Sequence, residues 1–311
     1  MAPKLISVVT PCYNEEANVR ELHQRVKAVF DTLSAYRYEH FFIDNASRDG
    51  TVAVLRELAR EDPNVKVIVN TRNFGHIRSP YHALLEARGH AVIGMASDLQ
   101  DPPELIPKFL ERWEEGYKVV LGVKETSEET RVLYAVRESY YRLLARIADV
   151  EIVRQSTGFG LYDREVIDQI RKLDDPYPYF RGLIGELGYE SARIPYSQPR
   201  RQRGITSQNF YTLYDLAMLG VVNHSKVPLR LATMTGFAMA VLSFLIGLGY
   251  LVAKLVFWQN FTLGIAPILI GFFFLSSIQL VFVGIVGEYI GAIYTQVKKL
   301  PVVVEKERIN C

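Results

Sequence analysis

The sequence predicts an α/β domain with a parallel, doubly wound sheet, followed by a two-helix membrane hairpin. Three observations support this fold class. Short β-branched or aromatic runs alternate with helix-like stretches in the first part of the chain, polar turn-forming residues follow four of these runs, and charge nearly disappears near the C-terminus. The 311 residues are enough for one large domain or two ordinary ones.

Charge is unevenly distributed along the chain. The totals are balanced, with 36 Lys+Arg against 34 Asp+Glu and a net charge of +2. No charged residue lies between Arg230 and Lys254, or between Lys254 and Glu288. This pattern excludes a purely soluble enzyme, and the near-zero net charge argues against a nucleic-acid partner. Cys12 and Cys311 predict neither a disulfide framework nor a zinc site.

The soluble part contains five predicted strands, each apolar enough to be buried on both faces, as in parallel sheets. They are Leu5–Thr10, His40–Asp44, Val65–Asn70, Ala91–Ala96 and Lys118–Val123. The stretches between them carry helical signals, and they are Glu15–Leu33, Asp49–Ala59, Ser79–Ala87 and Glu104–Glu115.

Residues 231–253 and 264–287 each reach the length of about 20 apolar residues that a spanning helix needs. The alternative is a pair of buried core helices. Lys and Arg flank the hairpin, whereas the connecting loop has only Lys254. The positive-inside rule therefore predicts an integral protein of the inner or plasma membrane with both termini in the cytoplasm, and Glu288 at the interface.

The predicted organisation has four parts: residues 1–205 as a cytoplasmic domain, 206–229 as an interfacial region, 230–290 as the hairpin and 291–311 as a cytoplasmic tail. In the interfacial region, apolar residues recur every three or four positions, at Phe210, Leu213, Tyr214, Ala217 and Val221. This spacing predicts an amphipathic helix in the headgroup plane, with a plain packing helix as the alternative.

Ligands of open α/β sheets bind beyond the carboxyl ends of the strands. No glycine-rich phosphate loop is present in the sequence, so a bound nucleotide would need a carboxylate-held metal. Asp98 and Gln100 are one residue apart and would share a side in an extended chain, where they suit a hard cation. Alternatively, Asp101 begins a helix as its N-cap, with prolines in the first turn.

Two other strand ends carry candidate ligands. Asp44 can accept hydrogen bonds from a uracil N–H or from ribose hydroxyls, and the alternative is a turn capped by Ser47 and Asp49. Tyr13 can stack on a base. Glu15 can act in the site or simply favour the helix macrodipole.

The segments SVVTPCYNEE, IDNASRDGT, RNFG and SDLQDPPE occur in an order that resembles the inverting family-2 glycosyltransferases. Within them the chain is similar to polyprenyl-phosphate glycosyltransferases of the dolichol-phosphate mannose synthase and bactoprenol glucosyltransferase types. VPLRLAT before the first span and GEYIGAIYTQVKKLP after the second extend the resemblance over essentially the whole chain.

The resemblance implies a GT-A (Rossmann-like) fold, a nucleotide-sugar donor with a UDP-sugar favoured, and Mg²⁺ or Mn²⁺ as cofactor. It also implies transfer with inversion to the phosphate of a membrane polyprenol (undecaprenyl or dolichyl phosphate), for cell-envelope glycan or glycoconjugate modification, and a possible homo-oligomer. The implied donor-binding residues are Pro11, Tyr13, Asn14, Glu15, Asp44, Ser97, Asp98 and Lys124.

The resemblance assigns the metal to Asp98 and Gln100, and catalysis to Asp98, Arg200 and Arg203. It assigns the acceptor phosphate to Arg131, Arg137, Arg200 and Arg203. For the basic residues before the first span, including Arg201, attraction to anionic lipid is the alternative reading.

Three positions depart from the family pattern. Ala96 replaces the first Asp of Asp-x-Asp, Asn45-Ala46 replaces Asp-Gly, and Gly158 stands where relatives have an Asp. A phosphate acceptor has a second pKa near 6 and is mostly dianionic at neutral pH, so it needs no strong general base. The alternatives are a degenerate, non-catalytic relative and a polysaccharide-synthase-like transferase, whose usual Q-x-x-R-W motif is missing.

Overall fold

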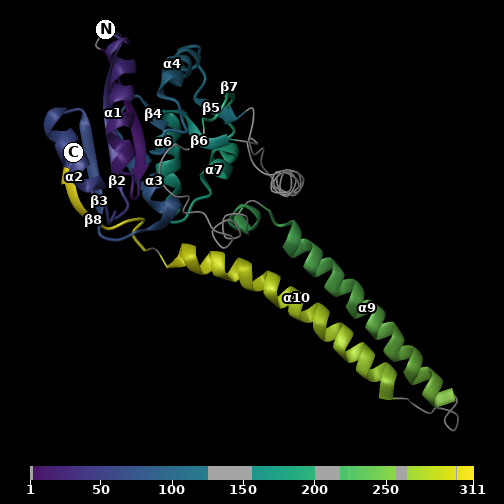
Figure 1. Ribbon diagram of the computed structural model, residues 1–311. Helices are drawn as coiled ribbons and strands as arrows, with labels where there is room; N and C mark the ends of the chain where they lie inside the picture. The colour runs from purple at the N-terminus through teal and green to yellow at the C-terminus, as the bar shows by residue number, and fades with distance from the viewer. Residues whose placement is uncertain (1–2, 125–155, 200–217, 224, 257–264, 299) are drawn as a thin grey trace.

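The computed structural model describes residues 3–124, 156–199, 218–223, 225–256, 265–298 and 300–311. The protein consists of an α/β domain, which carries both chain termini, and two long helices that project from it (Figure 1). The predicted α/β class is therefore confirmed.

One sheet of eight strands forms the centre of the domain, in the order β7-β5-β6-β4-β1-β2-β3-β8. Its strands are β1 Lys4–Cys12, β2 Tyr36–Asp44, β3 Val65–Asn70, β4 Ala91–Gly94, β5 Val119–Lys124, β6 Ser156–Asp163, β7 Ser191–Tyr196 and β8 Glu305–Ile309.

The expectation of a wholly parallel sheet is wrong. Strands β4, β1, β2 and β3 are parallel neighbours, but β6 lies antiparallel between β4 and β5, and β8 is antiparallel to β3. Strand β7 pairs in parallel with β5. The sequence analysis assigned none of β6, β7 and β8, and β6 lies between β4 and β5 although it follows both in the chain. Strand β4 also ends at Gly94, two residues earlier than expected.

Helices cover both faces of the sheet. One apolar cluster joins β1 to α1 (Glu16–Asp31) and α4 (Ile106–Glu114), and a second packs α2 (Thr51–Glu61) beside α1. A third cluster, on the opposite face, contains α3 (Gly75–Glu86), α6 (Arg164–Leu173) and α7 (Phe180–Glu186). The short 3-10 helix η1 (Pro103–Leu105) precedes α4. The domain is therefore a three-layer α/β/α structure.

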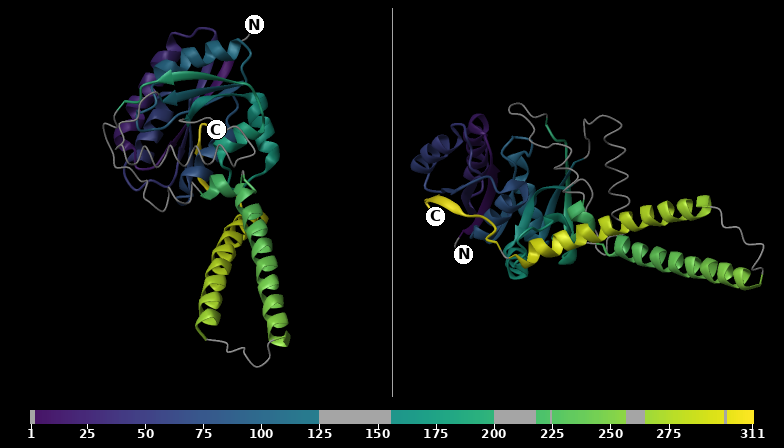
Figure 2. Two further views of the ribbon diagram at one scale, coloured as in Figure 1. Left: turned by 90° about the vertical axis from the view of Figure 1, so that its right-hand side faces the viewer. Right: turned by 90° about the horizontal axis from the view of Figure 1, so that it is seen from below.

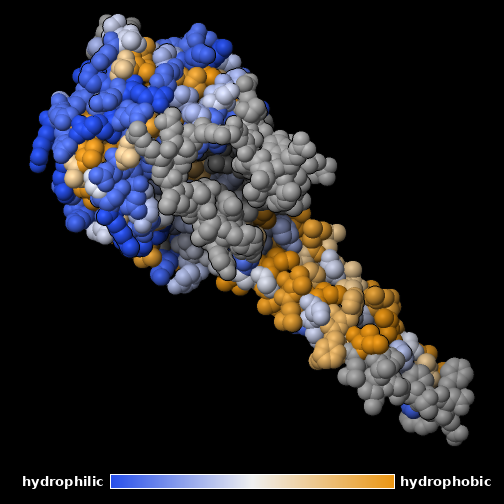
Figure 3. All heavy atoms as spheres, in the orientation of Figure 1, coloured by the Kyte–Doolittle hydropathy of each residue, from blue (hydrophilic) through white to orange (hydrophobic). Residues whose placement is uncertain are grey.

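The two projecting helices are α9 (Val227–Val256) and α10 (Ile265–Val297). Both contain segments long and apolar enough to cross a membrane, and the most apolar stretch of each has no residue buried within the protein. Met234 and Phe237 are 69% and 73% exposed. Figure 3 shows the resulting apolar surface along the hairpin. Such exposure contradicts the alternative of buried core helices and is typical of lipid-facing residues.

After α10 the chain returns to the α/β domain. Strand β8 pairs with β3 at the edge of the sheet, where Thr71 N donates to Val304 O at 2.9 Å. Arg308 pairs with Glu86 at 2.8 Å, and Asn310 Nδ2 donates to Val65 O at 3.0 Å. The predicted tail 291–311 thus contains the end of α10 and an edge strand, and both ends of the hairpin lead back to one domain (Figures 1 and 2).

Two hydrogen bonds also join elements at the base of the hairpin. Tyr289 Oη of α10 donates to Ser225 O at 2.6 Å, and Gln296 Nε2 donates to Asp175 Oδ1 of the domain at 3.4 Å. Of the predicted amphipathic helix, residues 218–223 are helical, whereas 206–217 lie outside the described residues.

Candidate active site

The carboxyl ends of β1, β2 and β4 meet at one edge of the sheet. Cys12 of β1 is in register with Asp44 of β2, and Met95 N, just after β4, donates to Val9 O of β1 at 3.0 Å. Three of the predicted polar segments therefore lie side by side, as the rule for open α/β sheets requires.

The loops after β1 and β2 are connected by hydrogen bonds. Asn14 N donates to Ser47 Oγ at 2.9 Å, and Arg48 N donates to Asn14 Oδ1 at 2.8 Å. Glu15 N donates to Thr51 Oγ1 at 2.9 Å. Asn14 has a positive φ of 56°, a conformation that Asn tolerates better than most residues. Asn14, a predicted donor-binding residue, thus also fixes the neighbouring loop.

Asp44 is fully buried and has one acceptor atom without a partner. Its Oδ2 accepts from Ser47 N at 3.0 Å, whereas no donor among the described residues reaches Oδ1. Burial raises the pKa of Asp44, and hydrogen bonds from Ser47 oppose that shift. A buried carboxylate oxygen at a strand end without a donor is suited to accept a ligand N–H or O–H.

Asn45 is a structural residue of the site that the sequence analysis missed. Its Nδ2 donates to Asn73 Oδ1 at 2.9 Å and to Gly75 O at 3.0 Å, while its Oδ1 accepts from Phe74 N at 2.8 Å. These bonds fix the RNFG segment beside the end of β2. The available signal was its place, directly after a strand and next to Asp44. The next residue, Ala46, has a φ of 62°.

The other predicted donor-binding residues at the end of β1 and just after it are partly or fully buried. Pro11 and Tyr13 are half-buried, and Glu15 is 8% exposed, with Oε2 accepting from Asn18 Nδ2 at 2.6 Å. Burial raises the pKa of the Cys12 thiol, with smaller contributions from the Asp44 and Glu15 carboxylates. This thiol is therefore unreactive at neutral pH.

The chain after β4 is a turn, so the extended geometry assumed for Asp98 and Gln100 is wrong. Leu99 between them has a φ of 62°. Asp98 Oδ1 accepts from Gln100 N at 3.2 Å, and Gln100 Nε2 donates to Pro199 O at 3.1 Å. Since the amide nitrogen of Gln100 is engaged by Pro199, its Oε1 is the atom that could face a cation.

Asp101 does not cap a helix, contrary to the alternative considered from sequence. Its Oδ2 accepts from Ala96 N at 2.9 Å and its Oδ1 accepts from Tyr196 Oη at 3.0 Å. Burial raises the pKa of Asp101 to about 6, while nearby Lys124 acts in the opposite direction. Lys124, a predicted donor-binding residue, is opposite Tyr196 in the β5–β7 ladder and thus lies on the Asp101 side of the site.

The donor set fits one hard divalent cation that takes most of its shell from elsewhere. Within the described ranges, no group of three or more His, Cys, Asp or Glu residues could hold a metal. Asp98 and Gln100 would supply one carboxylate and one amide oxygen, and phosphate oxygens and water would complete the shell. Ser97, 6% exposed, lies in the same turn within hydrogen-bonding reach of Cys12.

The predicted acceptor arginines Arg131, Arg137, Arg200 and Arg203 lie outside the described residues. Gly158, where the family resemblance predicts an Asp, belongs to β6 and has a φ of 93°. A Cβ added at this position would meet no atom of the described residues within 4 Å, but the backbone conformation favours glycine.

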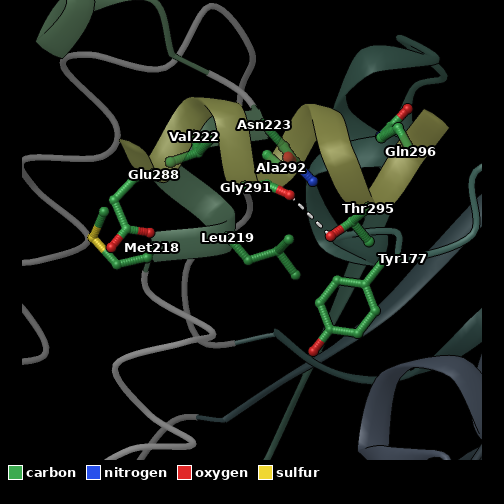
Figure 4. Close-up of a pocket in the computed structure, with 10 residues that line it drawn as sticks. All are labelled: Tyr177, Met218, Leu219, Val222, Asn223, Glu288, Gly291, Ala292, Thr295 and Gln296. Carbon is green, nitrogen blue, oxygen red and sulfur yellow. Dashed lines mark hydrogen bonds between the residues drawn. The ribbon is translucent and has the colours of Figure 1, made fainter. Parts of the chain in front are cut away.

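A cavity of about 280 Å³ lies at the base of the hairpin. Figure 4 shows Glu288 beside Met218 at one side of the cavity, and Tyr177 beside Thr295 at the other. Glu288 is exposed and lies toward the domain end of α10. The cavity is thus formed by the domain, the 218–223 helix and α10 together.

Comparison with known protein families and sequences identifies the class of enzyme to which this chain belongs. The model of glycosyl transferase family 2 matches residues 7–171. The uncharacterized glycosyltransferase YkcC of Bacillus subtilis is 36% identical over 95% of this chain and 91% of its own length. The SfII prophage-derived bactoprenol glucosyl transferase of Shigella flexneri is 35% identical over 95% of this chain and 96% of its own.

Among solved structures, glucosyl-3-phosphoglycerate synthase from Mycobacterium tuberculosis, in complex with Mn²⁺, UDP and phosphoglyceric acid, matches with a TM-score of 0.49 and 18% identity. The match covers 70% of this chain and 76% of that one.

The family match and these relatives show that the α/β/α domain is the catalytic domain of a glycosyltransferase. The chain belongs to glycosyl transferase family 2, and the mixed sheet is its GT-A fold.

Proposed function

We propose that this glycosyltransferase transfers a sugar from a nucleotide-sugar donor to the phosphate of a membrane polyprenol, with inversion. One observation carries the proposal: after the exposed apolar hairpin the chain returns to the catalytic domain and completes its sheet as β8. Relatives named bactoprenol glucosyl transferase align over the whole of this arrangement, 95% of the chain. A transferase built onto such a hairpin is suited to an acceptor that resides in the membrane.

The donor nucleotide would occupy the strand-end edge of the sheet. Asp44 Oδ1 is the buried acceptor for a base N–H, which favours a UDP-sugar, and the half-buried Tyr13 can stack on the base. The other predicted donor-binding residues line the same three strand ends or the end of β5: Pro11, Asn14, Glu15, Ser97, Asp98 and Lys124.

Mg²⁺ or Mn²⁺, held by Asp98 and Gln100, would offset the charge that develops on the diphosphate leaving group. The protein then needs to bind the acceptor phosphate, align this phosphate with the anomeric carbon of the sugar, and exclude water. The dianionic acceptor requires no strong base, which is compatible with Gly158 in place of a carboxylate. Cationic side chains would bind the acceptor phosphate, and Arg131, Arg137, Arg200 and Arg203 remain the predicted ones.

The pairing of β8 with β3 supports the prediction that both ends of the hairpin lie on one side of the membrane. Because β8 pairs with β3, the chain that enters the hairpin and the chain that leaves it belong to one domain and need to lie on one side of the membrane. The Lys/Arg bias selects the cytoplasmic side.

The test is a transfer assay with purified full-length protein, undecaprenyl phosphate and a panel of radiolabelled nucleotide sugars, in Mg²⁺ or Mn²⁺. We expect a lipid-linked, monoglycosylated product from one UDP-sugar, with inverted anomeric configuration. Lack of transfer from every donor would favour a degenerate relative, to which Ala96 and Gly158 point. Formation of a polymer would instead favour a polysaccharide-synthase-like transferase.

A further inference from the structure

Asp101 closes the loop that carries Asp98. The Asp101 side chain is 4% exposed and reaches back to Ala96 N, five residues upstream, at 2.9 Å. Residues 96–101 therefore form a ring closed by one carboxylate. Its second oxygen accepts from Tyr196 Oη at 3.0 Å, so the ring is attached to a strand distant in sequence. Both hydrogen bonds are made by a buried carboxylate, for which unmet hydrogen bonds are costly.

The position of the Tyr196 hydroxyl is itself fixed by packing. Tyr196 is 5% exposed, and its ring lies edge-on to Phe159 of β6, with 5.5 Å between the ring centroids. Gly122 of β5 leaves the space that both rings use, because a Cβ at that position would lie 3.2 Å from Tyr196 Cε1 and 2.9 Å from Phe159 Cδ1. Three strands therefore hold the hydroxyl that meets Asp101.

A second hydrogen bond links the same two segments. Gln100 Nε2 donates to Pro199 O at 3.1 Å, and Pro199 is three residues beyond Tyr196. The Gln100 backbone amide also donates to Asp98 Oδ1 at 3.2 Å. The orientation of the Asp98 carboxylate thus depends on Gln100. Gln100 is itself held by its side-chain hydrogen bond to Pro199 O and by the next residue in the chain, Asp101, which closes the loop.

We propose that Asp101 and Tyr196 are positioning residues that hold the 96–101 loop so that Asp98 and Gln100 present their oxygens to one divalent cation. Asp101 and Tyr196 act on the cation through this loop. The inference rests on the proposed function in one respect: it assumes that Asp98 and Gln100 are the residues that bind the metal. It gives the buried Asp101 carboxylate a role beside a site that already carries Asp98.

The test measures Mn²⁺ binding to the full-length protein in detergent with UDP, from the electron paramagnetic resonance signal of free Mn²⁺. Tyr196→Phe removes the hydroxyl and keeps the ring. We expect it to weaken Mn²⁺ binding about 10-fold, the lower end of the effect of removing a group that orients a metal ligand. Tyr38→Phe is the matched control, because Tyr38 Oη donates to Asp62 Oδ2 at 2.8 Å away from the site. The control should bind Mn²⁺ like the wild type.

Amide hydrogen exchange supplies the second measurement. In Tyr196→Phe and in Asp101→Asn we expect faster exchange in residues 95–101 and unchanged exchange in α1 and β1. Wild-type Mn²⁺ affinity in the folded Tyr196→Phe variant would overturn the proposal. Faster exchange throughout the domain, or loss of folding, would also overturn it, since the pair would then support the fold as a whole.

These measurements require no acceptor lipid and no turnover. If the wild type binds Mn²⁺ and UDP but fails to glycosylate polyprenyl phosphate, the proposed function is wrong. The positioning role is then still decided by the comparison of Mn²⁺ binding between the wild type and Tyr196→Phe. If Tyr196→Phe binds Mn²⁺ normally while the wild type transfers sugar to the lipid, only the positioning role is wrong.

Discussion

Asn14 and Ser47 join the first two strand-end loops through a 2.9 Å hydrogen bond from the Asn14 amide to Ser47 Oγ. Ser47 N in turn donates to Asp44 Oδ2 at 3.0 Å, so one serine orients both loops around Asp44. The other carboxylate oxygen of Asp44, Oδ1, is buried and has no hydrogen-bond partner among the described residues. The edge of the sheet is thus organised before any ligand binds, which lowers the entropic cost of binding.

The first prediction concerns this unpaired oxygen. Asp44→Asn should weaken UDP binding by about 1.5–3 kcal/mol, the value of a hydrogen bond to a charged group, or about 10- to 100-fold in Kd. Isothermal titration calorimetry with UDP measures the Kd of the wild type and of the variant. Asp49→Asn is the control: Asp49 accepts from Thr51 N at 3.1 Å at the start of α2, so its loss should lower stability and leave Kd nearly unchanged. Equal losses of affinity in both variants would contradict the role of Asp44.

The second prediction concerns the Asp98 carboxylate. Asp98→Ala should reduce sugar transfer by more than about 100-fold and remove the dependence on Mg²⁺ or Mn²⁺, because the cation loses its one carboxylate. The variant should keep the wild-type thermal transition, since the Asp98 side chain is half-buried and accepts one local hydrogen bond. Asp168→Ala, an exposed position that pairs with Arg171 on α6, is the control. Wild-type turnover of Asp98→Ala would remove the metal assignment.

The third prediction concerns backbone strain next to the donor site. Ala46 has a φ of 62°, a left-handed conformation that costs non-glycine residues about 1–2 kcal/mol. Ala46→Gly should therefore stabilise the protein by about 0.5–1 kcal/mol, after the larger unfolded-state entropy of glycine is deducted. Thermal unfolding in detergent measures it. The same substitution at Ala53, exposed within α2, should destabilise by about 0.5–1 kcal/mol. A lower transition temperature for Ala46→Gly would show that the methyl group contributes packing.

The fourth prediction concerns two buried histidines. His23 Nδ1 lies 3.2 Å from His40 Nδ1, and burial lowers the pKa of both rings. Both are neutral in the fold, whereas in the unfolded chain they take up protons below about pH 6.5. The stability that they contribute is therefore present above pH 6.5 and is lost as the pH falls below it.

Other charged groups around this pair modulate the effect. Asp62 Oδ2 lies 3.4 Å from His23 Nε2 and favours the charged ring, whereas Lys27 and Arg20 disfavour it. Thermal unfolding of the wild type between pH 5 and 8 should show the loss, and His40→Gln should flatten it. An identical pH slope in the variant would assign the acid sensitivity to groups other than this pair.

The fifth prediction concerns the edge of the sheet. Ending the chain after residue 301 removes β8 and exposes β3, whose backbone groups then become a template for pairing with other chains. We expect a lower thermal transition and aggregation after extraction, detected by size-exclusion chromatography. Glu307→Gln, which weakens only the exposed ion pair with Arg56, should change stability by at most about 1 kcal/mol. A monodisperse truncated protein with wild-type stability would contradict the role of β8.

Local patterns were sufficient to predict strands β1 to β5 and to propose candidate site residues at their ends. Strands β1 to β5 are apolar runs with polar ends, and parallel strands bring those ends to one edge, which is why Asp44 and Asp98 could be proposed from sequence. Strand β8 has the sequence EKERI, which lacks an apolar face, and its pairing with β3 depends on contacts across most of the chain. The partner of Asp101 is likewise 95 residues away, at Tyr196, and no local signal indicates it.

Strand β8 also has a consequence for the order of assembly. Synthesis runs from the N-terminus, so β1 to β7 are complete before α9 and α10 emerge, and β8 follows both. The outer edge of β3 therefore stays open until the apolar helices have been made, and the sheet is completed only when residues 305–309 follow. A chain that loses its reading frame within the hairpin leaves a nearly complete but open-edged domain, which exposes the defect to proteolysis and aggregation.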